Sequence, residues 1–266
     1  MSQPILKATP DSFVGVAPVN WGIENVALLE ETHGIQWLED STFSLAPTDA
    51  KADADAGILA RGTITLEDGV EAQLMVEEPI GELHTLASRS KEPYTPTEVV
   101  LLKSHTAAWR FVVKGGTSRC PKAARAFARI AATLVDAGAA GIFMPGLTAL
   151  HSPRFVKYMT MHLNQPENLA NLLVHAWHQD GWMMTRGLTA FGLPELETPI
   201  SDGMNDAYFR VMDVAANMIT INRPFPDESD LTLGFKNYRI FDEQRGPRDE
   251  QVPMSGTFGV QSIVGK

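Results

Sequence analysis

The segment best suited to bind a small ligand is a loop of two glycines and two hydroxyl residues that precedes a predicted helix. Backbone N–H groups at a helix N-terminus are free to donate, and the first turn also carries positive side chains, which run against the helix dipole. This combination is consistent with a bound phosphate or carboxylate. Ordinary side-chain capping explains the same residues and is the simpler interpretation, because the Gly-x-x-x-x-Gly-Lys-Ser/Thr order of a P-loop is missing. The candidate anion-binding residues are Gly115, Gly116, Thr117, Ser118, Arg119 and Lys122.

The same loop holds the single cysteine of the chain, Cys120. Arg119 and Lys122 lie close to it in sequence, and positive neighbours favour the thiolate form of a cysteine. A catalytic thiolate also needs a positioned base, which no local pattern supplies. Cys120 is therefore a candidate reactive thiol, while an inert cysteine is the favoured interpretation.

The histidines do not form a metal-binding pattern. His175 and His178 are three residues apart, whereas two ligands on one strand face need a spacing of two and two on a helix need a spacing of four. His151 precedes Ser152, but this serine looks like a helix start and not like a nucleophile, since no Gly-x-Ser-x-Gly elbow exists in the sequence. We predict no metal site, no cofactor and no catalytic residue.

Composition narrows the classes of function. The chain has 266 residues with a formal net charge of −10, and 44% of its residues are hydrophobic. Such a charge disfavours broad binding to nucleic-acid phosphates, and the hydrophobic content is typical of a folded globular protein. The sequence has no apolar leader and no apolar run of about 20 residues, so we expect a cytoplasmic protein without a membrane segment.

The loop belongs to the clearest structural unit of the sequence, from His105 to Met144. Thr106–Val113 is rich in strand formers, Pro121 suits the first turn of a helix, and Gly138 suits the position after its end. Ala139–Met144 is short and apolar. This order predicts a strand, a helix and a second strand parallel to the first, joined by a right-handed crossover.

Further elements follow along the chain. Asp68-Gly69 and Asp180-Gly181 each separate two strand-like runs and predict tight hairpins. Thr97 and Ser201-Asp202 look like helix caps. We predict an α+β fold of mixed and antiparallel sheets with helices packed on one face, in two related halves of ferredoxin-like type. The proline-containing segment Lys91–Thr97 places a boundary between residues 1–92 and residues 93–266.

Several signatures in the second half resemble the DUF4261 domain family of uncharacterised bacterial proteins. They are the opening at His105, the Leu-His-Ser-Pro sequence at residues 150–153, and the run GLTAFGLPELE from Gly187 to Glu197. The similarity covers about Pro79 to Phe241. The family has no established role, so the resemblance implies no catalytic residue.

Two functions remain open on these grounds. The first is a non-catalytic protein-binding factor of the bacterial cytoplasm, of the immunity or adaptor type, whose acidic surface would suit a basic partner. The second is an enzyme or small-ligand sensor that binds an anionic group at the Gly115–Lys122 loop. The first is favoured, because no complete catalytic, metal or nucleotide motif supports the second.

Overall fold

The computed structural model describes residues 12–20, 37–38, 41–47, 51–66, 69–114, 121–243, 245, 248 and 258–266. The chain divides into two compact units, the first reaching His162 and the second beginning at Leu163. Each unit is built on its own sheet. The fold is therefore α+β, as the sequence predicts.

The first unit holds a sheet that is antiparallel throughout, with seven strands among the described residues. In spatial order these are β2 (Thr42–Pro47), β3 (Ile58–Thr65), β4 (Glu71–Glu77), β5 (Ala107–Lys114), β1 (Ser12–Val19), β6 (Ile142–Met144) and β7 (Ala149–His151). The described α-helices of this unit are α2 (Lys51–Asp55), α3 (Pro96–Ser104), α4 (Pro121–Asp136) and α5 (Pro153–Met161), and the 3₁₀ segments are η2 (Leu83–Arg89) and η3 (Pro145–Leu147).

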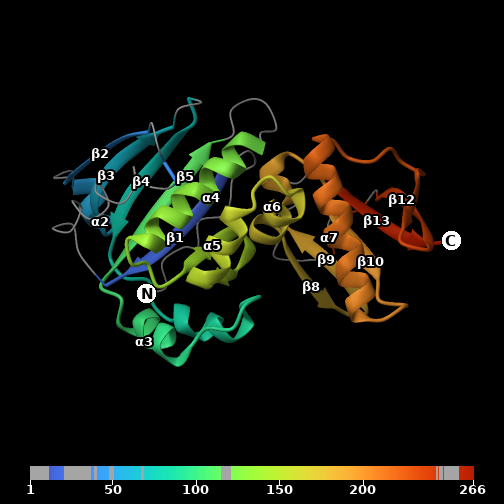
Figure 1. Ribbon diagram of the computed structural model, residues 1–266, viewed down its shortest axis with the longest axis horizontal. Helices are drawn as coiled ribbons and strands as arrows, with labels where there is room; N and C mark the ends of the chain where they lie inside the picture. Colours follow the sequence, from blue (N-terminus) through green and yellow to red (C-terminus); the bar gives the residue numbers. More distant parts are fainter. Residues whose placement is uncertain are drawn as a thin grey trace. The chain divides into compact units, whose positions relative to one another are not determined.

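The predicted strand–helix–strand unit is present as β5, α4 and β6. Because β1 pairs antiparallel with both β5 and β6, these two strands run parallel to each other with β1 between them. Helix α4 lies over the strands β5 and β1 (Figure 1). Its Phe127 packs against Phe111 of β5, with ring centroids 4.8 Å apart. Gly15 of β1 lies opposite Phe111, and a Cβ at this position would collide with the Phe111 ring. A glycine here lets the ring lie flat over the strand and fill the core beneath α4.

The hairpin of β3 and β4 confirms the Asp68-Gly69 prediction, although residues 67–68 themselves lie outside the described residues. Sheet pairing continues from β4 to β5 across residues 92 and 93, so the first sheet spans the predicted boundary. The segment around that boundary starts α3, and its cap is Thr95, not Thr97. Thr95 and Glu98 form a reciprocal capping box, which satisfies two backbone N–H groups at once.

The second unit holds a mixed sheet, with six strands among the described residues. The one parallel pair of this sheet joins β10 to β13, and the other pairs are antiparallel. In spatial order its strands are β11 (Asp230–Leu233), β12 (Lys236–Glu243), β13 (Val260–Gly265), β10 (Glu195–Pro199), β9 (Trp182–Arg186) and β8 (His175–Gln179). Its described helical segments are α6 (Pro166–Leu173), η4 (Leu188–Phe191) and α7 (Met204–Ile221).

The turn between β8 and β9 confirms the second hairpin. Asp180 and Gly181 both have positive φ angles, 51° and 79°, as a type I′ turn requires. Helix α7 packs on the second sheet (Figure 1). On its inner face, Ala207, Val211 and Ala215 are fully buried. Neither sheet has the four-stranded βαββαβ arrangement of a ferredoxin-like unit. The ferredoxin-like form of the prediction is therefore wrong, because local hairpins such as β2–β3 and β11–β12, together with distant pairings such as β1–β5 and β10–β13, give sheets of seven and six described strands.

Candidate functional site

The predicted anion-binding loop gains no structural test. Residues 115–120, which include Gly115, Gly116, Thr117, Ser118, Arg119 and Cys120, lie outside the described residues. Lys122 is described and is exposed in the first turn of α4. Anion binding and thiol reactivity at this loop stay predictions.

The histidines have structural surroundings. His105 follows the last residue of α3, and both nitrogens of its ring form hydrogen bonds. Its Nδ1 lies 2.7 Å from the Leu102 carbonyl oxygen of α3, and its Nε2 accepts from the Ile80 N–H at 3.0 Å. His151 is 2% exposed and stacks on Phe155 at 4.9 Å. Within the described part of the chain, no three His, Cys, Asp or Glu side chains cluster in a way that could hold a metal ion.

The second unit carries a hollow of about 270 Å³ between α7 and the hairpin of β11 and β12. Its wall on the helix and its wall on the hairpin both combine charged and apolar side chains. We call it the α7 hollow. It is lined by Asp206, Phe209, Arg210, Asp213, Leu233, Gly234, Phe235, Lys236 and Tyr238.

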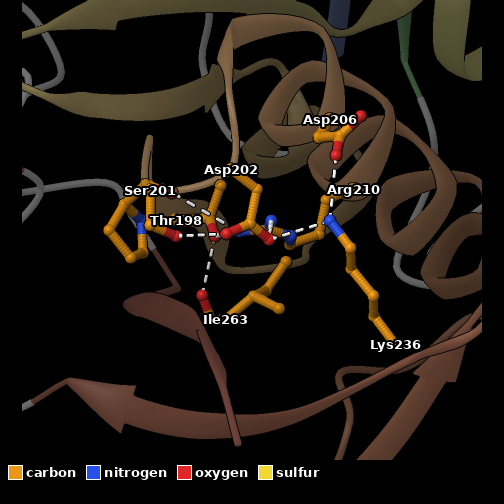
Figure 2. Close-up of polar contacts among 8 residues, drawn as sticks. Thr198, Ser201, Asp202, Asp206, Arg210, Lys236 and Ile263 are labelled. Carbon is orange, nitrogen blue, oxygen red and sulfur yellow. Dashed lines mark hydrogen bonds and ion pairs between the residues drawn. The ribbon is translucent and has the colours of Figure 1, made fainter.

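Arg210 fixes the floor of the α7 hollow. Its guanidinium donates from Nη1 to Thr198 Oγ1 of β10 at 2.7 Å and from Nη2 to Asp202 Oδ2 at 3.1 Å (Figure 2). It also lies 4.4 Å from the centre of the Tyr238 ring of β12, within the range of a cation–π contact. Thr198 in turn donates to the Ile263 carbonyl oxygen of β13. One buried side chain therefore connects α7 with three strands of the second sheet.

Asp202 joins the helix to the hairpin. The sequence predicts that Ser201 and Asp202 cap α7, but the N-cap is Gly203 and no side chain caps the helix. Instead, Asp202 accepts from Arg210 and from Lys236 Nζ, the latter at 3.2 Å, and Lys236 also donates to Asp206 at 3.0 Å (Figure 2). Lys236 is the first residue of β12, so its ammonium group holds the hairpin tip against α7.

These contacts shift the pKa values of both partners. The Lys236 ammonium, the Ser201 hydroxyl and the nearby Arg210 hold the pKa of Asp202 below its usual range. Asp206 and Asp202 together raise the pKa of Lys236. Because the pKa of Asp202 is lower in the folded chain, the contact is complete above the ordinary Asp pKa of about 3.9 and is lost as the pH falls through the lowered value.

We therefore expect the Asp202 carboxyl to titrate below about pH 3.9, the value for an unperturbed aspartate. The measurement is its ¹³C chemical shift as a function of pH. Lys236→Met removes the main cause of the shift and should move the midpoint upward. A midpoint that is the same in both proteins would show that Lys236 does not hold Asp202 in solution.

The rim of the α7 hollow exposes two aromatic rings. Phe209 on α7 is 61% exposed, and Phe235 at the hairpin tip is fully exposed. Along α7, Phe209 lies between Asp206 and Asp213, which are also exposed. Because these rings stay largely in water, they contribute little hydrophobic free energy to the fold.

The described lining of this hollow holds two carboxylates, two cations, two phenylalanines and one tyrosine. Its described lining contains no Ser, Cys or His, the residues that most often serve as nucleophile or general base. Both lining cations, Arg210 and Lys236, are already paired with carboxylates. The described lining therefore offers aromatic surface and one carboxylate, Asp213, that forms no ion pair with a described residue.

The sequence did not lead to this hollow, although it carried a usable signal. Asp206, Phe209 and Asp213 have the spacing of one exposed helix stripe, and a phenylalanine on a polar stripe has no place in the core. In the structure, Gly234 and Phe235 form the turn between β11 and β12, where a large apolar residue is unusual.

Two glutamates of the run Gly187–Glu197, which carries the family resemblance, stabilise the fold. Glu195 accepts from the N–H groups of Gly187 and Thr189 and from the hydroxyls of Thr185 and Thr189. Glu197 is 1% exposed and pairs with Arg245 at 2.6 Å and Arg248 at 3.1 Å. Both side chains fix loops of the second unit, so at these two positions the sequence is explained by folding.

No helix among the described residues is long and apolar enough to cross a membrane. Comparison with family models, with curated proteins and with solved structures found no match for this chain. The resemblance to the DUF4261 domain family stays a prediction.

Proposed function

We propose that this chain is a non-catalytic protein-binding factor of the bacterial cytoplasm, of the immunity or adaptor type, and that its partner docks over the α7 hollow. The observation that carries the proposal is the full exposure of Phe235 across the α7 hollow from the exposed Phe209. Aromatic residues are enriched in the centres of protein interfaces, where burial of a ring contributes strongly to affinity.

Rigid presentation of the two rings supports the same function. Phe209 belongs to a helix that Arg210 ties to the sheet, and Phe235 belongs to a turn that Lys236 ties to the helix. A pre-positioned ring loses little conformational freedom on binding, which leaves more of the contact energy for affinity. The formal net charge of −10 favours a partner with a basic surface.

The test is co-purification of the tagged, full-length chain from cells that produce it naturally, compared with the double variant Phe209→Ala with Phe235→Ala. We expect one stoichiometric partner with the unchanged chain. With that purified partner, the double variant should bind at least about 30-fold more weakly, since a central aromatic pair is worth about 2 kcal/mol or more.

Phe258→Ala is the matched control, because it removes a ring that is 46% exposed at another place in the second unit. It should leave the affinity unchanged, and circular dichroism should show all variants folded. Recovery of no stoichiometric partner would contradict the proposal, and so would a partner that binds the double variant as tightly as the unchanged chain.

A further inference from the structure

The α7 hollow contains one carboxylate that the structure leaves without a positive partner. Asp202 and Asp206 are paired with Arg210 and Lys236. Among the described residues, no cation forms an ion pair with Asp213, which is exposed on the same helix stripe. This end of the hollow is therefore negative, whereas the other end is neutralised.

A second acid strengthens the negative charge at this end. Glu167 of α6 is near enough to Asp213 to repel its ionised form, and α6 packs directly on α7. Partial burial is the larger cause, and together the two effects raise the pKa of Asp213. The lining itself carries two carboxylates, Asp206 and Asp213, and two cations, Arg210 and Lys236. Outside the lining, Asp202 pairs with both cations and Glu167 lies near Asp213, so Asp213 is the lining carboxylate whose charge is not offset by a described ion pair.

The neighbouring rings suit the stem of a long cationic side chain. Phe209 and Asp213 are separated by four positions on α7, which places their Cβ atoms about 6 Å apart on one face. Phe235 lies on the opposite wall of the hollow. Lysine and arginine cover apolar surface with their methylene stems while the charged head reaches a polar group. The floor already contains such a contact, since Arg210 lies over Tyr238.

We propose that the α7 hollow receives a lysine or arginine side chain of the partner protein, with its charged head at Asp213 and its stem across Phe209 and Phe235. This inference rests on the proposed function and specifies the chemistry of the partner. An anionic group would be repelled by Asp213, and a purely apolar side chain would bury Asp213 further without neutralising it.

The direct test uses the full chain and two small probes, acetyl-Gly-Arg-Gly-amide and the same peptide with citrulline in place of arginine. Citrulline keeps the shape of arginine but has no charge. Binding is followed by ¹⁵N chemical shifts of α7 and of Lys236. We expect the arginine peptide to bind about tenfold more tightly than the citrulline peptide, as befits one charge-assisted hydrogen bond.

Asp213→Asn should abolish the preference for arginine. Asp180→Asn is the matched control, because it removes one carboxylate from the turn between β8 and β9, and asparagine tolerates the positive φ angle there. This control should keep the preference. Equal binding of the two peptides, or an unchanged preference in Asp213→Asn, would overturn the inference.

Binding measurements with the natural partner distinguish this inference from the proposed function. If Asp213→Asn weakens that partner about tenfold, as loss of one charged contact predicts, both stand. If Asp213→Asn has no effect while Phe209→Ala with Phe235→Ala abolishes binding, the cationic side chain is wrong and the docking surface stands. If neither change affects the partner, both are wrong.

Discussion

Replacement of Glu195 by alanine should destabilise the second unit by about 3 kcal/mol, because it leaves several buried donors without an acceptor. The carboxylate is 2% exposed and accepts from two hydroxyls and two backbone N–H groups. These donors belong to Thr185, Gly187 and Thr189, so the turn from β9 into η4 depends on one side chain. The measurement is hydrogen exchange of β9 and β10 during urea unfolding.

Glu195→Gln separates shape from charge. The amide keeps one acceptor oxygen, so this variant should lose far less stability than Glu195→Ala. Burial raises the pKa of Glu195 despite its hydrogen bonds. Its contribution to stability is therefore largest below the ordinary Glu pKa of about 4.3 and declines as the pH rises through the raised value. Glu195→Gln should lack this decline.

Glu167→Ala serves as the control for the alanine variant, since Glu167 is an exposed glutamate of the same unit. It should change the free energy of unfolding by no more than about 0.5 kcal/mol, as is usual for surface positions. Similar destabilisation by Glu167→Ala and Glu195→Ala would show that the four hydrogen bonds contribute nothing specific.

The second large effect is expected in the first unit, where Glu77→Ala should cost about 4 kcal/mol. Arg110 of β5 donates to Glu77 of β4 from Nε at 2.6 Å and from Nη2 at 2.8 Å, and both side chains are nearly buried. Removal of the carboxylate leaves a guanidinium in the middle of the sheet without its counter-ion. Urea unfolding followed by hydrogen exchange of β4 and β5 measures the loss.

Replacement of both partners gives the opposite result. Glu77→Leu with Arg110→Met removes both charges and fills similar volume, so it should restore most of the stability lost in Glu77→Ala. The free energy lost in the double variant is compared with the sum of the losses in Glu77→Leu alone and Arg110→Met alone. Equality would show that the two side chains act independently, against the geometry of the ion pair.

Local patterns predicted the elements that local physics decides. The helix face of α4 and the glycine after its end gave the helix from Pro121 to Asp136, with Gly138 in the expected positive-φ position. The two Asp-Gly turns gave two hairpins. In each case the residues that determine the helix end or the turn lie within a few positions of it, so these elements can be predicted from a single sequence.

Pairing between distant segments was beyond the same reasoning. Nothing in the sequence of Ser12–Val19 indicates that this strand separates β5, which begins at Ala107, from β6, which begins at Ile142. The α7 hollow depends on a similar encounter, between Phe209 on a helix and Phe235 on a later hairpin. The hydrophobic periodicity of a sequence predicts which face of each helix or strand is polar, but it does not predict which helices and strands pack against each other.

The place of β13 sets an order of events during synthesis of the chain. This strand is the last of the second sheet in sequence, yet it lies between β10 and β12 in space. Once β10 is complete at Pro199, the edge that pairs with β13 stays unpaired until β13 ends at Gly265; β12, complete at Glu243, waits for the same strand. Because chains grow at about 5–20 residues per second, the edge of β10 stays open for several seconds and that of β12 for about one to four seconds. The nascent second unit is then exposed to strand exchange between neighbouring chains, until β13 emerges and closes the sheet.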